Sequence, residues 1–239
     1  MASGMGIAMK SFPEGFRALV IGASGAIGAA GVARLRADPK CAEVVGLHRK
    51  SLPRIDFENE ETIAVAAEAL ARGAPFDLII IATGLLHSPR FMPEKRFSDL
   101  NYAQMFETFR VNAFGPALVL SHFSKLIGND RAVIAVLSAK VGSIADNRLG
   151  GWYSYRASKA ALNMFLKTAS IEMKRTKPNA VLAALHPGTV TSCLSQPFRG
   201  AEAGRAPNDA ASDMLDVIDK LTPASTGQFF SYSGEKLPW

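Results

Sequence analysis

Cysteine is scarce in this chain of 239 residues, which contains only Cys41 and Cys193. Two cysteines do not make the disulfide framework of a small secreted protein, so the sequence favours a cytoplasmic location. Long hydrophobic runs are also missing: the longest, 78–86, is interrupted by Thr83 and Gly84 and is too short to span a bilayer. The first residues lack the basic start and apolar core of a signal peptide, so we expect no export and no membrane partner.

Clusters of metal ligands and of basic residues are missing too. The four histidines show no metal-ligand spacing with each other or with the cysteines, so we expect no metal site. The net charge is +6, but only 48–50 and 174–177 are basic clusters, and the second suits the solvated end of a helix. A nucleic-acid surface needs a basic stripe with interleaved aromatic residues, so we expect no nucleic-acid partner.

Apolar runs alternate with amphipathic segments along the whole chain. This alternation predicts an α/β fold: a single Rossmann-type, doubly wound domain over 1–239, with a mostly parallel seven-stranded sheet and helices on both faces. The expected strands are 17–22, 43–47, 54–56, 77–81, 132–137, 180–185 and 228–230. The expected helices are 26–37, 59–72, 102–127 (kinked near Gly115-Pro116), 151–175 and 208–221. The irregular segment 188–207 is a candidate substrate lid.

A glycine-rich turn joins the first expected strand to the first expected helix. In Gly22-Ala-Ser24-Gly25-Ala-Ile27-Gly28, the first glycine suits a tight turn and the second suits the approach of a pyrophosphate. The third suits close packing of helix and strand, and the helix N-terminus then faces the phosphates. The alternative is an ordinary strand-turn-helix connection. The context favours a dinucleotide site, with Ser24 and Ile27 beside the glycines.

The end of the second expected strand indicates which dinucleotide binds. Sites for NAD usually have Asp or Glu there to hold the ribose 2′-hydroxyl, whereas this chain has Leu47-His48-Arg49-Lys50. Two cations and no carboxylate suit a 2′-phosphate, so we predict NADP(H) in preference to NAD(H), with Arg49 as the main partner. The alternative is a solvated basic turn. Asp56 is placed to accept from the adenine amino group, or else serves as a turn residue.

The segment Tyr155-Arg-Ala-Ser-Lys159 carries the strongest catalytic signal. Tyr155 and Lys159 lie one turn apart on a helix, and an ammonium beside a phenol is expected to lower its pKa from about 10. Such a phenol can donate a proton to a carbonyl oxygen. Tyr232 also has a lysine four residues on, but glycine and proline around it exclude a helix. Ser138, at the end of an apolar run 17 residues before Tyr155, completes the pattern.

Together these features resemble the short-chain dehydrogenase/reductase family of single-domain type. The segment from Trp152 to Asn163 and the His186-Pro-Gly loop are closer still to its C-factor and sniffer-like carbonyl reductase branch. The resemblance implies an oxidoreductase that transfers a hydride between a nicotinamide and the carbonyl or alcohol of a small substrate. It also implies homodimers or homotetramers that pair through the two long helices. The apolar side chains Phe106, Phe109, Phe165 and Leu166 suit such an interface, and burial in the core explains them equally well.

The resemblance also implies residue roles. Tyr155 matches the proton donor, Lys159 the residue that binds the nicotinamide ribose, Ser138 the serine that holds the substrate oxygen, and Asn112 the asparagine of the proton relay. The implied cofactor-binding residues are Gly22, Ser24, Gly25, Ile27, Gly28, Arg49, Asp56, Phe57, Ala82, Thr83, Gly84, Tyr155, Lys159, Pro187, Gly188, Val190 and Ser192. Each has a plain structural alternative as a strand end, a core residue or a turn.

Three positions depart from the family pattern. Ala26 stands at the usual middle glycine, Ile21 replaces a threonine, and Ala82-Thr83-Gly84 replaces Asn-Asn-Ala-Gly. The three-residue glycine spacing is commoner in the extended, sugar-nucleotide-modifying branch. Only residues 156–239 follow the tyrosine, however, which is too few for the separate substrate domain of that branch.

The substrate and the physiological direction are left open by the sequence. The expected pocket wall, 87–92, 143–152 and 193–205, combines apolar Trp152, Phe91, Met92 and Phe198 with basic Arg90, Arg199 and Arg205. The first set favours an apolar ketone, aldehyde or quinone, and the second favours an acidic ketone. We expect an apolar substrate. The alternative function is that of a C-factor-like nucleotide-binding signalling or regulatory protein, which would not need Ser138 or Tyr155.

Overall fold

Seven strands form one sheet in the order β2-β1-β3-β4-β5-β6-β7. This computed structural model describes residues 8–198 and 200–239. All neighbouring pairs are parallel except β6 and β7, which are antiparallel. The strands are β1 (Phe16–Ile21), β2 (Cys41–Leu47), β3 (Leu78–Ile81), β4 (Val133–Leu137), β5 (Val181–His186), β6 (Phe229–Ser231) and β7 (Lys236–Leu237). The predicted α/β class and the mostly parallel seven-stranded sheet are confirmed.

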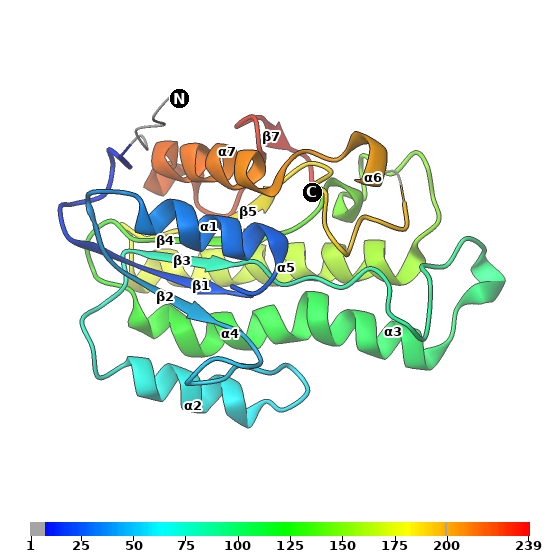
Figure 1. Cartoon of the computed structure of the whole chain (residues 1–239), viewed down its shortest axis with the longest axis horizontal. Coiled ribbons are helices and arrows are strands. Elements are labelled where there is room, and N and C mark those ends of the chain that lie inside the picture. Colours follow the sequence, from blue (N-terminus) through cyan, green and yellow to red (C-terminus); the bar gives the residue numbers. More distant parts are fainter. Residues whose placement is uncertain (1–7, 199) are drawn as a thin grey trace.

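Helices cover both faces of the sheet, as Figure 1 shows. One face carries α1 (Ala26–Arg36) and α7 (Pro207–Lys220), whose apolar residues pack on alternate residues of the central strands. The other face carries α2 (Glu61–Leu70), α4 (Gly115–Phe123) and α5 (Tyr153–Thr176), which pack on the residues between. Because strand residues alternate between faces, these near-continuous apolar strands supply two separate cores.

The predicted strand at 54–56 is wrong. Ile55 donates its backbone N–H to the His48 carbonyl at 3.2 Å, and Asp56 donates its own to Thr62 Oγ1 at 2.9 Å. The segment therefore folds back as a turn between β2 and α2, because its backbone groups find partners locally and none in the sheet. The seventh strand is instead β7, at the other edge, which was not predicted.

The predicted helix 102–127 is divided where its kink was expected. It consists of α3 (Tyr102–Phe109), a π-helical segment (Arg110–Phe114), α4, and a final 3-10 turn (Ser124–Leu126). Gly115 follows the π-helical segment directly, and a side chain there would collide with the Phe57 ring, since an added Cβ would lie 2.1 Å from it. A single π turn inside a long helix often marks a functional site.

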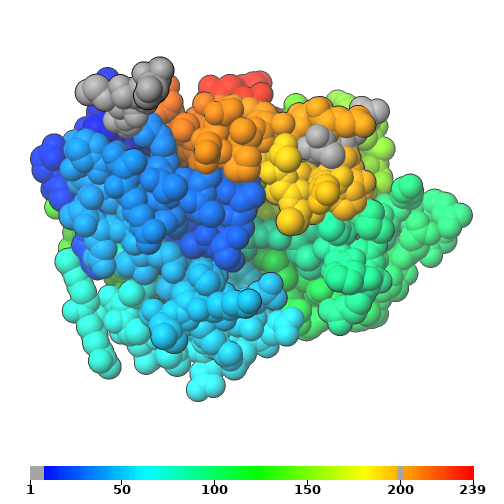
Figure 2. Space-filling view, in the orientation of Figure 1, coloured from blue at the N-terminus to red at the C-terminus, as the bar shows by residue number. Residues whose placement is uncertain are grey.

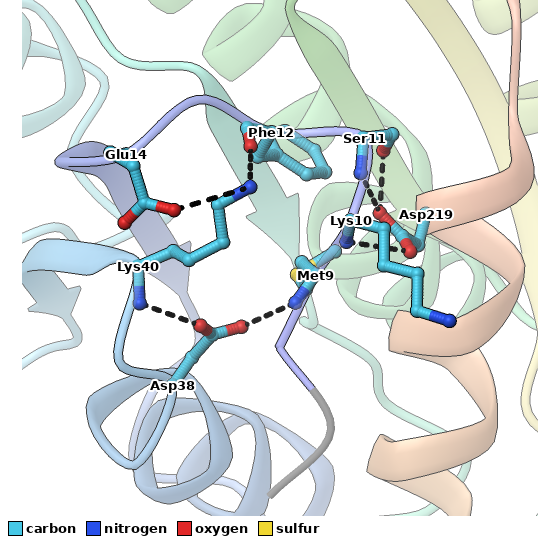
Figure 3. Close-up of polar contacts among 8 residues, drawn as sticks. All are labelled: Met9, Lys10, Ser11, Phe12, Glu14, Asp38, Lys40 and Asp219. Atoms are coloured by element: carbon cyan, nitrogen blue, oxygen red, sulfur yellow. Dashed lines mark hydrogen bonds and ion pairs between the residues drawn. The ribbon is translucent and has the colours of Figure 1, made fainter.

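The segment before β1 lies across the ends of α1 and α7 (Figure 3). Asp38, just after α1, accepts the backbone N–H of Met9 at 2.8 Å and that of Lys40 at 2.9 Å. Asp219, in the last turn of α7, accepts the backbone N–H groups of Lys10 and Ser11 at 2.9 and 2.8 Å. These bonds join the two helices of one face through the N-terminal segment.

Across the described residues, no helix has the length and apolarity needed to cross a membrane. The same residues contain no group of three or more His, Cys, Asp or Glu side chains that could hold a metal ion.

Candidate active site

The sequence-predicted site residues gather at the carboxyl ends of the parallel strands. The glycine turn follows β1, Arg49 follows β2, Thr83 follows β3, Ser138 follows β4 and Pro187 follows β5. In open parallel sheets this edge is where ligands bind. Figure 2 shows a hollow there, between the blue and light blue N-terminal segments, the teal segment after β3 and the yellow-to-gold lid segment.

The glycine turn is shaped as predicted at two of its three glycines. Gly22 has φ +88°, and an added Cβ would lie 2.9 Å from the backbone of Ala82. At Gly28 an added Cβ would lie 2.2 Å from the Gly22 carbonyl oxygen, so only glycine lets α1 pack this closely on the turn. Gly25 precedes α1 without any side-chain cap, which leaves the first N–H groups of the helix available to an anion. Ser24 is exposed on this turn, and Ile27 is half-buried.

The segment after β3 lies against this turn. Ala82 donates its N–H to the Ile21 carbonyl at 2.7 Å, and the Thr83 methyl would be 3.1 Å from a Cβ at Gly22. The Thr83 hydroxyl is buried and has no hydrogen-bond partner. Gly84 is exposed, and an added Cβ there would lie 3.9 Å from Asn112 Oδ1 and 4.0 Å from Lys159 Nζ. Thr83 and Gly84 therefore connect the glycine turn with the catalytic side chains.

The segment after β2 presents its cations to solvent. Arg49 and Lys50 are exposed, and within 8–198 and 200–239 their side chains make no ion pair. Asp56 uses its carboxylate in a turn, accepting the Glu58 N–H at 3.1 Å, which is the turn-residue alternative. Its predicted contact with an adenine remains a prediction. The ring of Phe57 rests against Gly115 at the start of α4.

Ser138 is buried directly after β4 and is held from two sides. Its N–H donates to the Leu185 carbonyl at 2.8 Å, and its hydroxyl donates to Asn163 Oδ1 at 2.6 Å. Asn163 lies one turn after Lys159 on α5, so helix spacing placed it on the same face. Sequence reasoning did not assign it a role, although the Tyr-Lys-Asn spacing was there to find.

Tyr155 and Lys159 are both buried on α5, but the predicted effect of the lysine on the phenol is wrong. Burial raises the pKa of Tyr155 to about 12, and burial lowers the pKa of Lys159 to about 8. The Lys159 ammonium donates to the Leu137 carbonyl at 3.0 Å. Loss of hydration therefore governs both groups in this structure, and the phenol stays protonated at neutral pH.

Asn112 lies in the π-helical segment and is fully buried. Its side-chain amide pairs twice with Leu85: it accepts the Leu85 N–H at 2.7 Å and donates to the Leu85 carbonyl at 2.7 Å. It also donates to Ser158 Oγ at 3.1 Å, on the turn of α5 between Tyr155 and Lys159. The π turn thus ties the loop after β3 to the catalytic helix, a role for Ser158 that the sequence did not suggest.

A series of aromatic contacts connects Tyr155 to the candidate lid and to the loop after β3. Trp152 makes an edge contact with Tyr155 at 6.2 Å between centroids, and Phe198 of the lid lies 5.1 Å from Trp152. His87 lies 5.8 Å from Phe198 and is hydrogen-bonded through Nε2 to the Cys193 carbonyl at 3.0 Å. The candidate lid and the loop after β3 therefore meet at His87 and Phe198, and Trp152 continues this aromatic contact to Tyr155.

Backbone hydrogen bonds join the two ends of the candidate lid, 188–207. Arg205 donates its N–H to the Thr189 carbonyl at 2.9 Å, and Thr191 donates its own to the Arg205 carbonyl at 3.0 Å, so Val190 and Arg205 pair as a bridge. Between them lie a turn that includes Ser192 and the helix α6 (Gly200–Ala203). Gly188, which follows Pro187 at the start of the lid, has φ +77°.

The basic residues expected on the pocket wall have other partners. The side chain of Arg205 pairs with Asp213 and lies 4.1 Å from the centre of the Tyr232 ring, on the far side of the lid base. Arg90 is 73% exposed and pairs with Glu107 at 2.5 Å. Arg199 lies outside the described residues.

Comparison with known proteins identifies the class of molecule. Residues 52–203 match the family model described as short chain dehydrogenase. The chain is 30% identical over 188 residues to 1-hydroxy-2-glutathionyl-2-methyl-3-butene dehydrogenase of Rhodococcus sp. (strain AD45), covering 78% of this chain and 79% of the relative. It is 38% identical over 144 residues to C-signal of Myxococcus xanthus, covering 59% and 82%.

The fold is also that of solved carbonyl reductases. The NADPH-bound carbonyl reductase from chicken fatty liver superposes with TM-score 0.81 at 22% identity, over 95% of this chain and 100% of the other. Carbonyl reductase Sniffer of D. melanogaster gives 0.80 at 19% identity, over the same shares. The chain belongs to the short chain dehydrogenase family. It is an oxidoreductase, and its fold is similar to that of the solved carbonyl reductases.

Proposed function

We propose that this protein is an NADP(H)-dependent reductase of a small, apolar carbonyl compound, acting from a single domain over 1–239. The observation that carries the proposal is the buried cluster of Ser138, Tyr155, Lys159 and Asn112 beside a glycine turn with a free helix N-terminus. A protein that only bound nucleotide would gain nothing from burying a phenol and an ammonium without ion partners, because each is costly to desolvate.

The residues present fit a dinucleotide. The close approach at Gly22 and Gly28 and the uncapped start of α1 suit a pyrophosphate, with Ser24, Gly25 and Ile27 around it. The unpartnered Thr83 hydroxyl, with Ala82 and Gly84, suits the middle of the cofactor, and Asp56 and Phe57 the adenine end. Pro187, Gly188, Val190 and Ser192 form the lid side. Because Arg49 and Lys50 are exposed and the segment 47–50 at the end of β2 contains no Asp or Glu, a 2′-phosphate is favoured over a free 2′-hydroxyl.

When bound, the nicotinamide exchanges a hydride with the carbonyl carbon. Ser138 and Tyr155 would bond the substrate oxygen, and the Ser138 hydroxyl, which donates to Asn163 Oδ1 without substrate, would redirect its proton to that oxygen. Tyr155 gives its proton as negative charge develops on that oxygen. A phenol whose pKa is raised to about 12 can still do so, since an alkoxide is far more basic than a phenolate. Lys159 and Asn112, both close to Gly84, would return the proton to Tyr155 through water.

The pocket wall supports an apolar substrate. Trp152 contacts Tyr155, Phe198 contacts Trp152, and His87 contacts Phe198, whereas Arg90 and Arg205 pair with Glu107 and Asp213. The relative from Rhodococcus is named for a glutathione conjugate, which carries carboxylates. In this chain Arg90 and Arg205 of the expected pocket wall pair with carboxylates of the protein itself, so we favour an uncharged ketone, aldehyde or quinone.

An exposed apolar face supports a homo-oligomer. On α3, Phe106 is 58% exposed, and on α5, Phe165 is 42% exposed, and the two helices pack side by side. Leu166 is instead part of the core, because it points to the sheet, so its expected place in the interface is wrong. We propose a dimer or tetramer through α3 and α5, to be measured by light scattering, and a cytoplasmic location consistent with two free cysteines.

The likeness to C-signal keeps a signalling role as the second candidate. One experiment distinguishes the reductase function from the signalling role. NADPH oxidation is followed with a panel of ketones, aldehydes and quinones, for the wild type and for Tyr155→Phe. We expect the wild type to oxidise NADPH with at least one uncharged carbonyl and Tyr155→Phe to lose turnover by at least about 1,000-fold while still binding NADPH. Cofactor binding without turnover by the wild type would favour the signalling role.

A further inference from the structure

Glu94 is a buried carboxylate that the proposed chemistry does not use. It lies in the loop between β3 and α3, and its residue is only 3% exposed. Within the described chain no lysine, arginine or histidine lies within ion-pair distance of it. A buried carboxylate without a cation is expensive, so its surroundings must supply hydrogen-bond donors.

Its donors come from the N-terminus of the catalytic helix. The backbone N–H of Ser154, in the first turn of α5, donates to Glu94 Oε2 at 3.2 Å, and the Ser154 hydroxyl donates to Oε1. The backbone carbonyl of Glu94 accepts the Trp152 N–H at 2.6 Å. One residue thus holds α5 at two points. Since a helix N-terminus is the positive end of its dipole, a carboxylate is well placed there.

One of these two anchored residues, Trp152, adopts an unusual backbone conformation. Trp152 has φ 53° and ψ 45°, the only positive φ of a non-glycine residue in the described chain. It follows Gly150 and Gly151, whose φ angles are +62° and +64°. The left-handed conformation is unfavourable for tryptophan, so neighbouring groups must hold it. The bond to the Glu94 carbonyl and the bonds from Arg156 Nε to the Gly150 and Gly151 carbonyls do so.

The turn at Trp152 positions residues on two sides of the expected substrate pocket. Trp152 contacts Phe198 of the lid and Tyr155, and Tyr155 directly follows the Ser154 that Glu94 binds. Without the Glu94 carboxylate the start of α5 would lose the acceptor for the Ser154 N–H and hydroxyl, and the left-handed turn would be held only by the Glu94 backbone carbonyl and Arg156. Either change moves the phenol relative to the substrate oxygen.

We propose that Glu94 is a positioning residue for catalysis: by binding Ser154 and Trp152 it fixes the Tyr155 phenol and the Trp152 ring in the geometry needed for proton transfer. The proposal rests on the proposed reductase function. Glu94 does not touch the substrate, so its removal is expected to act on turnover and leave cofactor binding unchanged.

The test compares Glu94→Ala, Glu94→Gln and the control Asp99→Asn in a Trp239→Phe background. Asp99 is a second carboxylate on the same loop that caps a turn, but it lies on the exposed side and touches neither Ser154 nor Trp152. The chain has two tryptophans, so Trp239→Phe leaves Trp152 as the sole tryptophan fluorophore. Steady-state kinetics, NADPH titration and Trp152 emission with acrylamide quenching are then measured on each variant.

We expect Glu94→Ala to lower kcat by about 10-fold to 100-fold, with NADPH Kd unchanged, and to shift Trp152 emission to the red with stronger quenching. Glu94→Gln should recover most of the wild-type kcat and of the wild-type Trp152 emission, because its amide oxygen still accepts the Ser154 N–H. Asp99→Asn should match the background protein. Wild-type kcat and emission in Glu94→Ala would overturn the proposal, as would equal loss of kcat and NADPH affinity in both Glu94 variants.

Should Glu94→Ala not fold, Ser154→Ala removes one of its two donors and decides the question in the same way. A smaller fall in kcat and a smaller emission shift support the proposal, and no change in either contradicts it. The emission readout does not depend on turnover. If the wild type reduces no carbonyl, the proposed function fails, and Trp152 emission in Glu94→Ala still shows whether Glu94 holds the turn.

Discussion

The two ends of the site are built in opposite ways. At the catalytic end, the side chains of Ser138, Asn112 and Lys159 are buried, and each is hydrogen-bonded to another part of the protein. At the nucleotide end, Arg49 and Lys50 are exposed and their side chains form no ion pair in the described chain.

This difference separates two tasks. Groups that meet a transition state must be oriented before the substrate arrives, and buried hydrogen bonds provide that orientation. Cations that attract a phosphate need only be placed near it and left free of competing carboxylates. The account therefore predicts that changes at the catalytic end alter rates, and that changes at the nucleotide end alter binding.

Removal of the Ser138 hydroxyl is expected to give the largest of the following effects. Ser138→Ala should lower kcat by about 100-fold to 1,000-fold, because one of two donors to the developing oxyanion is lost, and NADPH affinity should not change. Steady-state kinetics and cofactor titration measure both. The matched control is Ser143→Ala, which removes a buried hydroxyl five residues on that binds the Trp239 carbonyl. If Ser138→Ala weakened NADPH binding and left kcat intact, the separation of tasks would be wrong.

Removal of the Arg49 guanidinium is expected to act on binding alone. Arg49→Ala should raise the Kd for NADPH by about 10-fold to 100-fold and leave that for NADH unchanged, since only NADPH carries the 2′-phosphate. Fluorescence titration with both cofactors checks this. Arg54→Ala, an exposed arginine in the same segment, is the control. Equal loss of affinity for both cofactors would show that Arg49 does not recognise the phosphate.

Orientation at the catalytic end has a cost in stability, which Lys159 makes measurable. Its pKa is lowered to about 8 from 10.5 by burial, so below pH 8 the folded state carries a buried ammonium at full cost. Between pH 8 and 10.5 the unfolded state binds more protons, so the stability of the wild type rises with pH through this window. Lys159→Met should therefore be more stable by about 1–2 kcal/mol at pH 7, and the gain should vanish by about pH 10.5.

Denaturant unfolding of Lys159→Met and the wild type at pH 7, 9 and 10.5 tests this. The titration of Tyr155 above pH 10 is present in both proteins and cancels in the difference. A gain that stayed constant with pH would mean that burial of the ammonium is not its source.

The N-terminal segment should show the smallest effect, because it lies far from both ends of the site. Asp219→Ala removes the acceptor for two backbone N–H groups and the Ser11 hydroxyl (Figure 3), which should cost about 1 kcal/mol of stability. Turnover and cofactor affinity should match the wild type. A change in either would show that this segment reaches the site.

Much of the fold could be predicted because its signals are local. Buried parallel strands read as continuous apolar runs, and the glycine turn stands out because close backbone approaches allow no side chain at Gly22 and Gly28. The segment 54–56 was assigned to a strand wrongly, since Thr62 and His48, which satisfy its backbone, act from outside the segment itself.

The positions of the candidate site residues could be predicted from the sequence, but their pKa values could not. Ser138, Tyr155 and Lys159 have a fixed order and spacing. Their pKa values depend instead on how deeply the fold buries them, which spacing does not reveal. Glu94 had no sequence signal at all, because its partners on α5 are 58 and 60 residues away along the chain, at Trp152 and Ser154.

The most direct test of the division between the two ends is a stopped-flow measurement of NADPH oxidation by a carbonyl substrate from the panel. It compares the wild type, Tyr155→Phe and Arg49→Ala over a range of cofactor concentrations. The account predicts that Tyr155→Phe binds NADPH as the wild type does and loses the oxidation phase by at least about 1,000-fold. It predicts that Arg49→Ala reaches the wild-type oxidation rate at saturating NADPH. A wild-type rate in Tyr155→Phe, or a reduced saturating rate in Arg49→Ala, would contradict it.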